Sequence, residues 1–213
     1  MEAEKYKKDK SYFTIKKISP IIRFLTISDV LILSGFGLIS PIFAVFIVDT
    51  IKGGNLEVVG IASAVYLLTR SLIQIPAAGM IDKIKGERDD FWALLIGSLV
   101  FSLVPLAYLF VSTPMHLYFV QFFYGLATAL TYPSWLAIFT RHIDKEHEGV
   151  EWGVYQTLVD LGGAASASLG GFLAYQFGFN LLFVLVSLIS FMGSIFLLGI
   201  YRKMRVGYII SKK

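Results

Sequence analysis

The chain has 213 residues, of which 56% are hydrophobic, and its mean hydropathy is +0.70. This composition argues against a water-soluble domain and indicates a membrane protein. The 19 Lys and Arg residues outnumber the 15 Asp and Glu residues, and cysteine does not occur in the chain. The lack of cysteine excludes a disulfide framework, thiol catalysis and thiolate metal sites.

Six long apolar runs follow one another along the chain, separated by charged or turn-forming segments. Each has about 20 residues or more, which is enough helix to cross a hydrocarbon layer of roughly 30 Å. Helices are expected because a backbone in lipid must satisfy its own hydrogen bonds. The runs cover Ile22–Val48, Val58–Ala78, Phe91–Ser112, Met115–Phe139, Trp152–Phe177 and Leu181–Ile200.

The positive charges predict the orientation of these runs. All Lys and Arg residues except Lys52 and Arg70 lie before run one or at its start (Arg23), after run six, or in the loops that follow runs two and four. The positive-inside rule therefore places both termini in the cytoplasm. The basic ends are topology signals in contact with membrane lipid rather than a nucleic-acid site. We expect an all-α, multi-pass protein of the cell membrane, with six transmembrane helices in residues 22–200, a basic cytoplasmic segment at 1–21 and a basic cytoplasmic tail at 201–213.

Run one carries a carboxylate and several helix breakers. Asp29 lies near the cytoplasmic end of the run, shallow enough to reach the membrane interface. Gly and Pro bend or loosen helices, and bent helices line the sites of transporters, although both residues are also common in membrane helices in general. The breakers of runs one to four are Gly35, Gly37, Pro41, Pro76, Pro105 and Pro133.

Run two has a polar stripe that contains a buried charge. Tyr66, Arg70 and Gln74 recur at a spacing of four, so they share one side of a helix. Arg70 lies about 12 Å from the cytoplasmic end at a rise of 1.5 Å per residue. An ionisable side chain at membrane depth is costly unless it is paired or hydrated, which makes Arg70 a functional candidate. Tyr66 and Gln74 are candidates because they lie beside it.

The loop after run two, QIPAAGMIDKIKGER at residues 74–88, contains a recognisable motif. It resembles the loop between helices two and three of the major facilitator superfamily, where a Gly, an Asp-Arg pair and Gly-Arg-Arg form the best-known motif. Asp82 and Lys83 match the acid–base pair, and Gly86 and Arg88 resemble the end of the motif. Ala78 stands where the first Gly is expected, and one extra residue separates Asp82 from Gly86.

The resemblance implies that this loop is a latch that ties helix ends together in one conformation. The physical basis is sound, because carboxylates near a helix end interact with its dipole and with neighbouring basic groups. The alternative is a solvated hairpin between two helices, in which the same charges have no conformational role.

Run four adds a second likeness to the family. Leu117-x3-Gln121-x3-Gly125 follows the family's Leu-x3-Arg-x3-Gly spacing, with Gln in place of Arg, and this replacement puts a proton-exporter assignment in doubt. The same helix face carries a polar and aromatic stripe, which we expect to point into a shared, water-accessible cavity. For Gln121 and Thr128 taken alone, hydrogen bonding between helices is the better interpretation. The stripe comprises Gln121, Gly125, Thr128, Tyr132 and Trp135.

Run five combines a second buried charge with many small residues. Asp160 lies at a depth similar to that of Arg70 and shares its face with Gln156. Gly163, Ala167 and Gly171 recur at a spacing of four and allow another helix to approach closely. The run resembles the Gly-rich fifth helix of family antiporters but lacks its Pro.

The resemblance covers the whole chain but only half of a family transporter, which normally has twelve spans in two related halves. It implies the N-terminal six-helix half of a secondary transporter that moves a small molecule by alternating access. Two copies would supply the missing half as a homodimer, with Arg70 of one copy against Asp160 of the other, and Asp160 or Asp29 would permit proton coupling. The alternative is a non-transporting membrane scaffold or a fragment of a twelve-helix transporter.

No enzyme is expected from the motifs. Rhomboid-type proteases also have six spans, but Gly-x-Ser-x-Gly does not occur, and neither does a Walker loop or a dinucleotide fingerprint. No cofactor is implied. The loop after run four contains His142, Asp144 and His147, which we interpret as a hydrated linker rather than a metal site. The sequence leaves the substrate and the direction of transport open.

Overall fold

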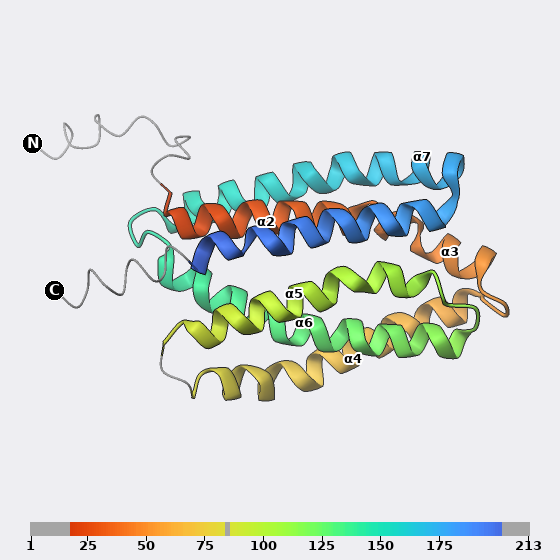
Figure 1. Cartoon of the computed structure of the whole chain (residues 1–213), viewed down its shortest axis with the longest axis horizontal. Helices are drawn as coiled ribbons and strands as arrows, with labels where there is room; N and C mark the ends of the chain where they lie inside the picture. Colours follow the sequence, from red (N-terminus) through yellow and green to blue (C-terminus); the bar gives the residue numbers. More distant parts are fainter. Residues whose placement is uncertain (1–17, 84–85, 202–213) are drawn as a thin grey trace, which may run out of the picture.

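The structure is a computed structural model, and it describes residues 18–83 and 86–201. This part of the chain consists of helices that run side by side in one bundle, without any strand (Figure 1). The prediction of an all-α protein is therefore confirmed. The elements are α2 (Pro20–Gly37), the 3-10 helix η2 (Ser40–Ile42), α3 (Phe43–Thr50), α4 (Leu56–Ile81), α5 (Arg88–Tyr108), α6 (Pro114–His142) and α7 (Glu148–Phe196).

Five helical segments in the described residues are long and apolar enough to cross a membrane. The last of them continues α7 to Tyr201 and has 54 residues. A straight helix of this length would extend about 80 Å, far more than the roughly 30 Å of one crossing. The segments are Pro20–Thr50, Leu56–Ile81, Arg88–Tyr108, Pro114–His142 and Glu148–Tyr201.

The long α7 is broken at Gly178, where φ is 80° and ψ is 170°. A side chain is rarely tolerated at such a positive φ, and glycine adopts it without steric cost. Within α7 the ribbon reverses its direction, so that its two parts run back along each other (Figure 1). Residues 148–177 are called the first arm of α7 below, and residues 179–201 the second arm. The two arms correspond to predicted runs five and six.

Predicted run one is interrupted where its helix breakers lie. Helix α2 ends at Gly37, and the chain passes through η2, which contains Pro41, before α3 begins. Proline lacks a backbone N–H and so interrupts helical hydrogen bonding. The other predicted breakers, Pro76, Pro105 and Pro133, lie inside α4, α5 and α6, and these helices continue through them.

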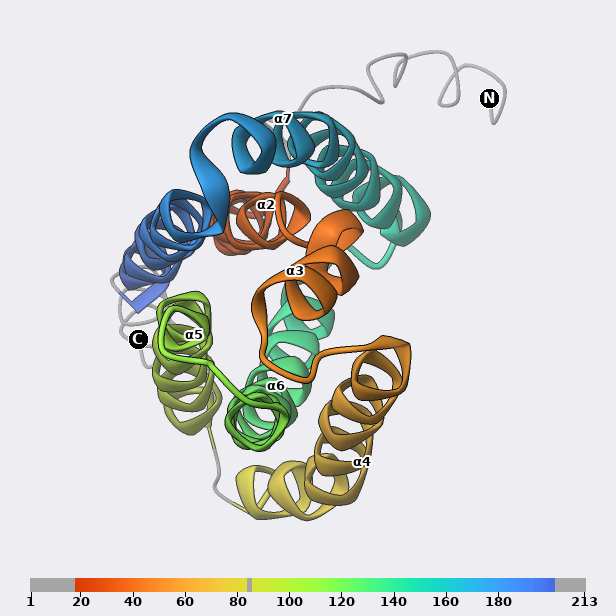
Figure 2. The same ribbon diagram turned by 90° about the vertical axis from the view of Figure 1, so that its right-hand side faces the viewer.

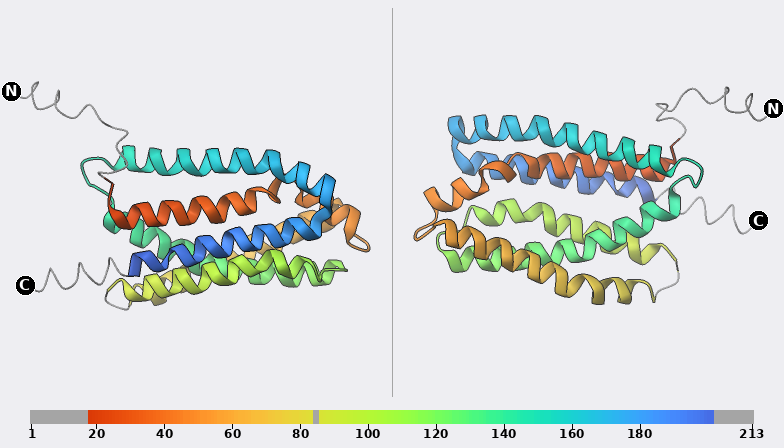
Figure 3. Two further views of the ribbon diagram at one scale, coloured as in Figure 1. Left: turned by 45° about the horizontal axis from the view of Figure 1, so that its top comes forward. Right: turned by 180° about the vertical axis from the view of Figure 1, so that it is seen from behind.

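Helix α2 lies between the two arms of α7 (Figures 2 and 3). Its approach to the first arm is so close that a Cβ on Gly170 would come within 1.9 Å of the carbonyl oxygen of Leu38. On the other side, the Ser28 hydroxyl donates to the carbonyl oxygen of Gly193 at 2.8 Å. Small residues thus bring three helical rods into backbone contact, as is common in membrane bundles.

Aromatic side chains fill both ends of the bundle. Near α3, the ring of Phe46 packs on Phe183 of the second arm, with 4.8 Å between ring centroids. At the opposite end, Phe139 of α6 lies 4.4 Å from Trp152 of the first arm. The two clusters fix the helices at each end, and the polar residues described below lie along the helices between them.

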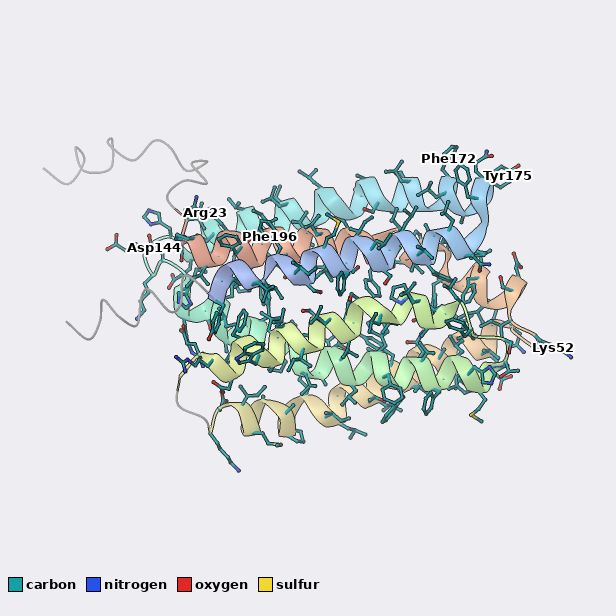
Figure 4. All side chains as sticks on the ribbon, viewed as in Figure 1. Arg23, Lys52, Asp144, Phe172, Tyr175 and Phe196 are labelled. Atoms are coloured by element: carbon teal, nitrogen blue, oxygen red, sulfur yellow. The ribbon has the colours of Figure 1, made fainter. Side chains whose placement is uncertain are left out.

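Charged residues lie at both ends of the bundle. Arg23 and Asp144 lie at one end of the bundle and Lys52 lies at the other (Figure 4). The beginning of α2 and the end of the second arm of α7 share the end that carries Arg23 (Figure 1). The assignment of this end to the cytoplasm stays a prediction from the distribution of positive charge.

Candidate functional site

The polar stripe predicted for run two is formed on α4, with Arg70 at its centre. Arg70 Nε donates to Gln74 Oε1 at 3.3 Å, and its Nη1 donates to the Tyr66 hydroxyl at 3.5 Å. The guanidinium carbon also lies 5.0 Å from the ring centroid of Tyr132 on α6, a cation–π contact. The charge is therefore held by three predicted site residues from two helices.

Helix α6 packs tightly on α4 at the level of this arginine. A Cβ on Gly125 would lie 2.7 Å from the carbonyl oxygen of Tyr66, so the two backbones almost touch. The ring of Tyr66 stacks on that of Tyr124, with 4.4 Å between centroids. Close packing around Gly125 thus fixes the position of the Arg70 stripe against α6.

Asp29 is tied to α7 by a hydrogen bond that the sequence did not reveal. The Tyr155 hydroxyl donates to Asp29 Oδ2 at 2.9 Å and joins the first arm of α7 to α2. The Tyr155 ring lies 5.0 Å from Trp135 of α6. Trp135 follows Tyr132 by three residues and so lies on nearly the same face of α6. Tyr132 thus contacts Arg70, and Trp135 contacts Tyr155, the hydrogen-bond donor to Asp29.

Asp160 is exposed on the first arm of α7. Its Oδ1 accepts a hydrogen bond at 2.8 Å from Nε2 of Gln156, one turn earlier on the same helix. Within residues 18–83 and 86–201, no hydrogen bond or ion pair joins Asp160 to Arg70. Each charge is instead bonded to a glutamine on its own helix.

Helix α4 and the first arm of α7 form the two edges of one side of the bundle (Figure 2). Helices α2 and α6 lie between these edges, toward the interior. We call this side the α4–α7 side. Both of its edge helices therefore carry a charged residue, Arg70 and Asp160.

The predicted stripe on α6 is divided between exposed and buried positions. Tyr132 is exposed beneath Arg70, whereas Gln121 and Trp135 are buried. The Gln121 Oε1 and Trp135 Nε1 atoms have no hydrogen-bond partner among the described residues. Thr128 donates to the carbonyl oxygen of Tyr124 on its own helix, at 2.7 Å, rather than to another helix. Within the described part of the chain, neither Gln121 nor Thr128 forms the hydrogen bond to another helix that was considered for them.

Two neighbouring stripes of small residues on the first arm of α7 have different surroundings. A Cβ on Gly162 would meet Ser34 Oγ of α2 at 2.2 Å, and Gly170 is equally close to α2. A Cβ on Gly163 or Gly171 would meet nothing within 4 Å. The stripe that packs within the chain thus lies one residue earlier than the predicted one. Contact of the Gly163, Ala167 and Gly171 stripe with a further helix stays a prediction.

The loop motif lies at the junction of α4 and α5. Asp82 directly follows α4, Gly86 has a φ of 131°, and Arg88 begins α5. The side chains of Asp82, Lys83 and Arg88 form no hydrogen bond or ion pair with another described residue. Residues 84–85 of the motif lie outside the described part. The latch implied by the family resemblance therefore stays a prediction, because no side-chain contact in the described residues supports it.

Two other pairs link helix ends at this end of the bundle. Arg141, in the last turn of α6, forms an ion pair with Asp90, which is only 1% exposed in the first turn of α5. His142 Nε2 lies 3.7 Å from Glu87 Oε2. In the sequence, Arg141 contributes only to the distribution of positive charge. The adjacent Asp89 and Asp90 at the start of α5 were the signal that could have indicated an acidic partner for Arg141.

The loop between α6 and α7 is organised by Asp144. Its carboxylate accepts a hydrogen bond at 3.0 Å from the backbone N–H of Glu146, and its Oδ2 lies 3.0 Å from His147 Nδ1. These two interactions lower the pKa of Asp144 below its ordinary value of 3.8, the backbone hydrogen bond having the larger effect. No group of three or more His, Cys, Asp or Glu suited to a metal ion occurs in the described residues.

Comparison with known proteins identifies the family of this bundle. The family model described as Major Facilitator Superfamily matches residues 25–207. An uncharacterised MFS-type transporter of Methanocaldococcus jannaschii is 28% identical over 165 residues, which are 74% of this chain and 41% of that protein. The chain therefore spans about two fifths of the length of this relative.

The fold agrees with the family match. The crystal structure of the POT family transporter PepTSo is similar with a TM-score of 0.69 at 16% sequence identity. The likeness covers 86% of this chain and 37% of that one, and at this identity it concerns the fold alone. Because the family model matches most of the chain, from the second turn of α2 to beyond α7, the chain belongs to the Major Facilitator Superfamily, a family of multi-pass membrane transporters.

Proposed function

We propose that the chain is a six-helix half of a secondary transporter in the cell membrane and moves a small molecule by alternating access. One observation carries this proposal. Arg70 and Asp160 lie on the two helices that border the α4–α7 side, and neither pairs with an opposite charge in the described residues. A charge in the middle of a transmembrane helix costs about 2.5–3.5 kcal/mol, so it is kept where it contacts water, a substrate or a partner.

The depth of both residues supports this reading. At a rise of 1.5 Å per residue, Arg70 lies about 16 Å along α4 from its end at Ile81, and Asp160 lies about 18 Å along α7 from its beginning at Glu148. Both of these helix ends lie at the same end of the bundle (Figure 1). The two charges are thus close to the middle of a hydrocarbon layer of roughly 30 Å, at similar heights.

A second six-helix half would cover the α4–α7 side, and in our proposal a second copy of this chain supplies it. Around a two-fold axis, α4 of each copy faces the first arm of α7 of the other, so one helix pair is used twice. Arg70 then meets Asp160 of the second copy. The open stripe of Gly163 and Gly171 supports this arrangement, because it leaves room for an approaching helix.

In this transporter the two halves rock about a site near the membrane midplane. The substrate site is formed by the polar groups around Arg70, with Tyr66, Gln74 and Tyr132 as its nearest side chains. Asp29 and Asp160 are the carboxylates available for proton coupling. The end of the bundle that carries Arg23 and Asp144 faces the cytoplasm, as the positive-inside rule requires.

Cysteine crosslinking tests the arrangement of the halves, because the natural chain has no cysteine that would give a background. Two differently tagged copies carry Ile75→Cys on α4 and Leu161→Cys on the first arm of α7. Both side chains are exposed, at 79% and 64%. A crosslink between the copies is expected. The matched control replaces Ile75→Cys by a cysteine at Leu103 of α5, which is also exposed. A crosslink from Leu103 but not from Ile75 would contradict the proposed arrangement of the two copies.

Transport is tested in proteoliposomes by electrophysiology on solid-supported membranes with a panel of small organic molecules. A compound that gives a saturable current in the wild type should lose most of that current in Arg70→Gln and in Asp160→Asn. Glu57→Gln is the matched control, since Glu57 lies in the first turn of α4, far from Arg70 along the helix. Full current in both variants would remove these charges from the mechanism.

A further inference from the structure

A partly open cavity of about 360 Å³ lies between the end of α2, η2, α3, α5 and α6. Four of its lining residues are aromatic, namely Phe36, Phe43, Tyr108 and Tyr124, and Gln121 lines it as well. Its volume falls in the range of about 300–1,000 Å³ that is usual for small-molecule sites. The cavity is therefore large enough to hold an organic ligand.

Gln121 is the unusual member of this lining. Its side chain is only 3% exposed, and Oε1 has no hydrogen-bond partner among the described residues. A buried carbonyl without a partner is unfavourable, because it has lost water and gained nothing in return. The side chain of Gln121 therefore lies at the wall of the cavity with its oxygen enclosed and, among the described residues, unpaired, and a rotation of the amide group would bring Oε1 to a donor on a bound molecule.

We propose that this cavity binds a neutral aromatic molecule that donates one hydrogen bond to Oε1 of Gln121. The inference rests on the proposed function and adds to it a ligand site that lies beside the proposed substrate site around Arg70. The ring of such a molecule lies among the aromatic side chains, and its N–H or O–H group points to Gln121.

The lining favours an aromatic ring over an aliphatic one. The Phe36 ring stacks on Tyr124 with 5.6 Å between centroids, and Phe43 lies 5.1 Å from Tyr108 in a tilted arrangement. These rings border the cavity from α2, α3, α5 and α6. Another ring can add offset or edge-to-face contacts with them, which are favourable beyond the burial of apolar surface.

The surrounding charges favour a neutral molecule. No Asp, Glu, Lys or Arg lines the cavity, so an ionic ligand would enter without a counter-charge, which is costly in a buried site. Behind the wall, Tyr124 stacks on Tyr66, whose hydroxyl accepts a hydrogen bond from Arg70. This positive charge one layer away opposes an organic cation.

The same stack connects the cavity to the site around Arg70. A ligand on the Tyr124 ring contacts the residue on which Tyr66 packs, and Tyr66 in turn holds the Arg70 guanidinium. A ligand in the cavity can therefore affect the position of the Arg70 guanidinium through Tyr124 and Tyr66, and the proposed transport mechanism uses this charge.

The test is a binding measurement on the full chain in lipid nanodiscs, with indole and 1-methylindole as probes, by isothermal titration calorimetry. Saturable indole binding is expected. Removal of the N–H donor in 1-methylindole should weaken binding about fivefold, the effect of one net hydrogen bond. Gln121→Leu should weaken indole binding by the same factor and leave 1-methylindole unchanged. Indole binding that is absent, or that is insensitive to both changes, overturns the proposal.

Controls separate a local effect from loss of the fold. Gln176→Leu makes the same chemical change at an exposed position outside the cavity lining, and it should leave indole binding unchanged. Ser40→Trp, at an exposed lining residue, should block indole without a change at Gln121. Indole binding that survives Ser40→Trp contradicts the assignment to this cavity.

Further readouts distinguish this inference from the proposed function. Tryptamine, the cationic relative of indole, should bind more weakly than indole, and tighter tryptamine binding would overturn the neutral class. The titrations require no transport, so Gln121-dependent indole binding without any transport in proteoliposomes would refute the proposed function alone. Transport together with indole binding that is independent of Gln121 would refute the inference alone.

Discussion

Tyr155 donates its hydroxyl hydrogen to Oδ2 of Asp29 across 2.9 Å and thereby joins the first arm of α7 to α2. Both side chains are half-buried. A carboxylate inside a membrane bundle needs such a donor, because lipid offers none. The bond explains how an acidic residue is tolerated in α2, and it makes the contact between α2 and α7 dependent on one phenol hydroxyl.

Replacing Tyr155 by Phe should therefore destabilise the bundle. Hydrogen bonds to charged groups contribute about 1.5–3 kcal/mol, and the remaining carboxylate would have no other side-chain hydrogen-bond partner in the described part of the chain. Thermal unfolding in lipid nanodiscs measures the effect. Tyr175→Phe is the control, since Tyr175 is 86% exposed. If Tyr155→Phe costs as much in an Asp29→Asn background as in the wild type, the bond is not the cause.

The ion pair between Asp90 and Arg141 should respond asymmetrically to mutation. Arg141→Gln leaves a carboxylate that is 1% exposed without its cation, whereas Asp90→Asn leaves an arginine that is 39% exposed and accessible to water. Breaking a buried pair costs about 3–5 kcal/mol, and we expect the lower part of this range for Arg141→Gln because that arginine is partly solvated.

Denaturant or thermal unfolding of the two variants checks this asymmetry. Arg141→Gln should be the less stable of the two. Lys145→Gln serves as the control, because it removes a positive charge from an exposed position in the adjacent loop. Equal destabilisation by Arg141→Gln and Asp90→Asn would contradict the account of Asp90 as a carboxylate that depends on one partner.

Two adjacent glycines of the first arm should tolerate alanine differently. Gly170→Ala places a Cβ 1.9 Å from the carbonyl oxygen of Leu38, so α2 and α7 must separate, whereas Gly171→Ala meets nothing within 4 Å. Gly171→Ala should be neutral or gain up to about 1 kcal/mol from the better helix propensity of alanine. The yield of folded protein and its melting temperature measure both variants, and a well-folded Gly170→Ala would contradict the close approach.

The loop between α6 and α7 should lose stability in acid. The pKa of Asp144 in the folded chain lies below its ordinary value of 3.8, because the backbone N–H of Glu146 and His147 interact with the carboxylate. A group with a depressed folded pKa stabilises the fold above the unfolded pKa and loses that contribution as the pH falls through the folded value. The contribution is thus complete above about pH 5 and disappears below pH 3.8.

Hydrogen exchange of the loop amides tests this pH dependence. Exchange in residues 144–148, corrected for the intrinsic effect of pH, should increase as the pH falls below 3.8 in the wild type. Asp144→Asn should show the faster exchange at neutral pH already and no further change in acid. A wild-type loop whose corrected exchange is the same at both pH values would contradict the role of Asp144.

Much of the fold follows from the sequence because the membrane imposes simple rules. Apolar length alone located the helical runs, and the turn at Gly178 falls in the gap between predicted runs five and six. The stripe of Tyr66, Arg70 and Gln74 was also predictable, since residues four apart on a helix are neighbours and all three can hydrogen-bond.

Contacts between helices were not predictable in the same way. Two such contacts join residues far apart in the chain, namely the hydrogen bond of Tyr155 to Asp29 and the ion pair of Asp90 with Arg141. Helical periodicity predicts which face of a helix a residue lies on, but it does not predict which other helix packs against that face. The packing stripe on α7 lies one residue from the predicted one, because the run contains small residues at nearly every position and its pattern does not single out one face.

Native mass spectrometry of the chain in lipid nanodiscs tests the central claim most directly. The proposal requires a second six-helix half on the α4–α7 side, and a second copy of the chain is the half that we propose. The expected result is the mass of two chains, with a shift to one chain in a variant that carries Gly171→Leu on the open stripe. A stable mass of one chain for the wild type would contradict the account, because nothing would then cover Arg70 and Asp160.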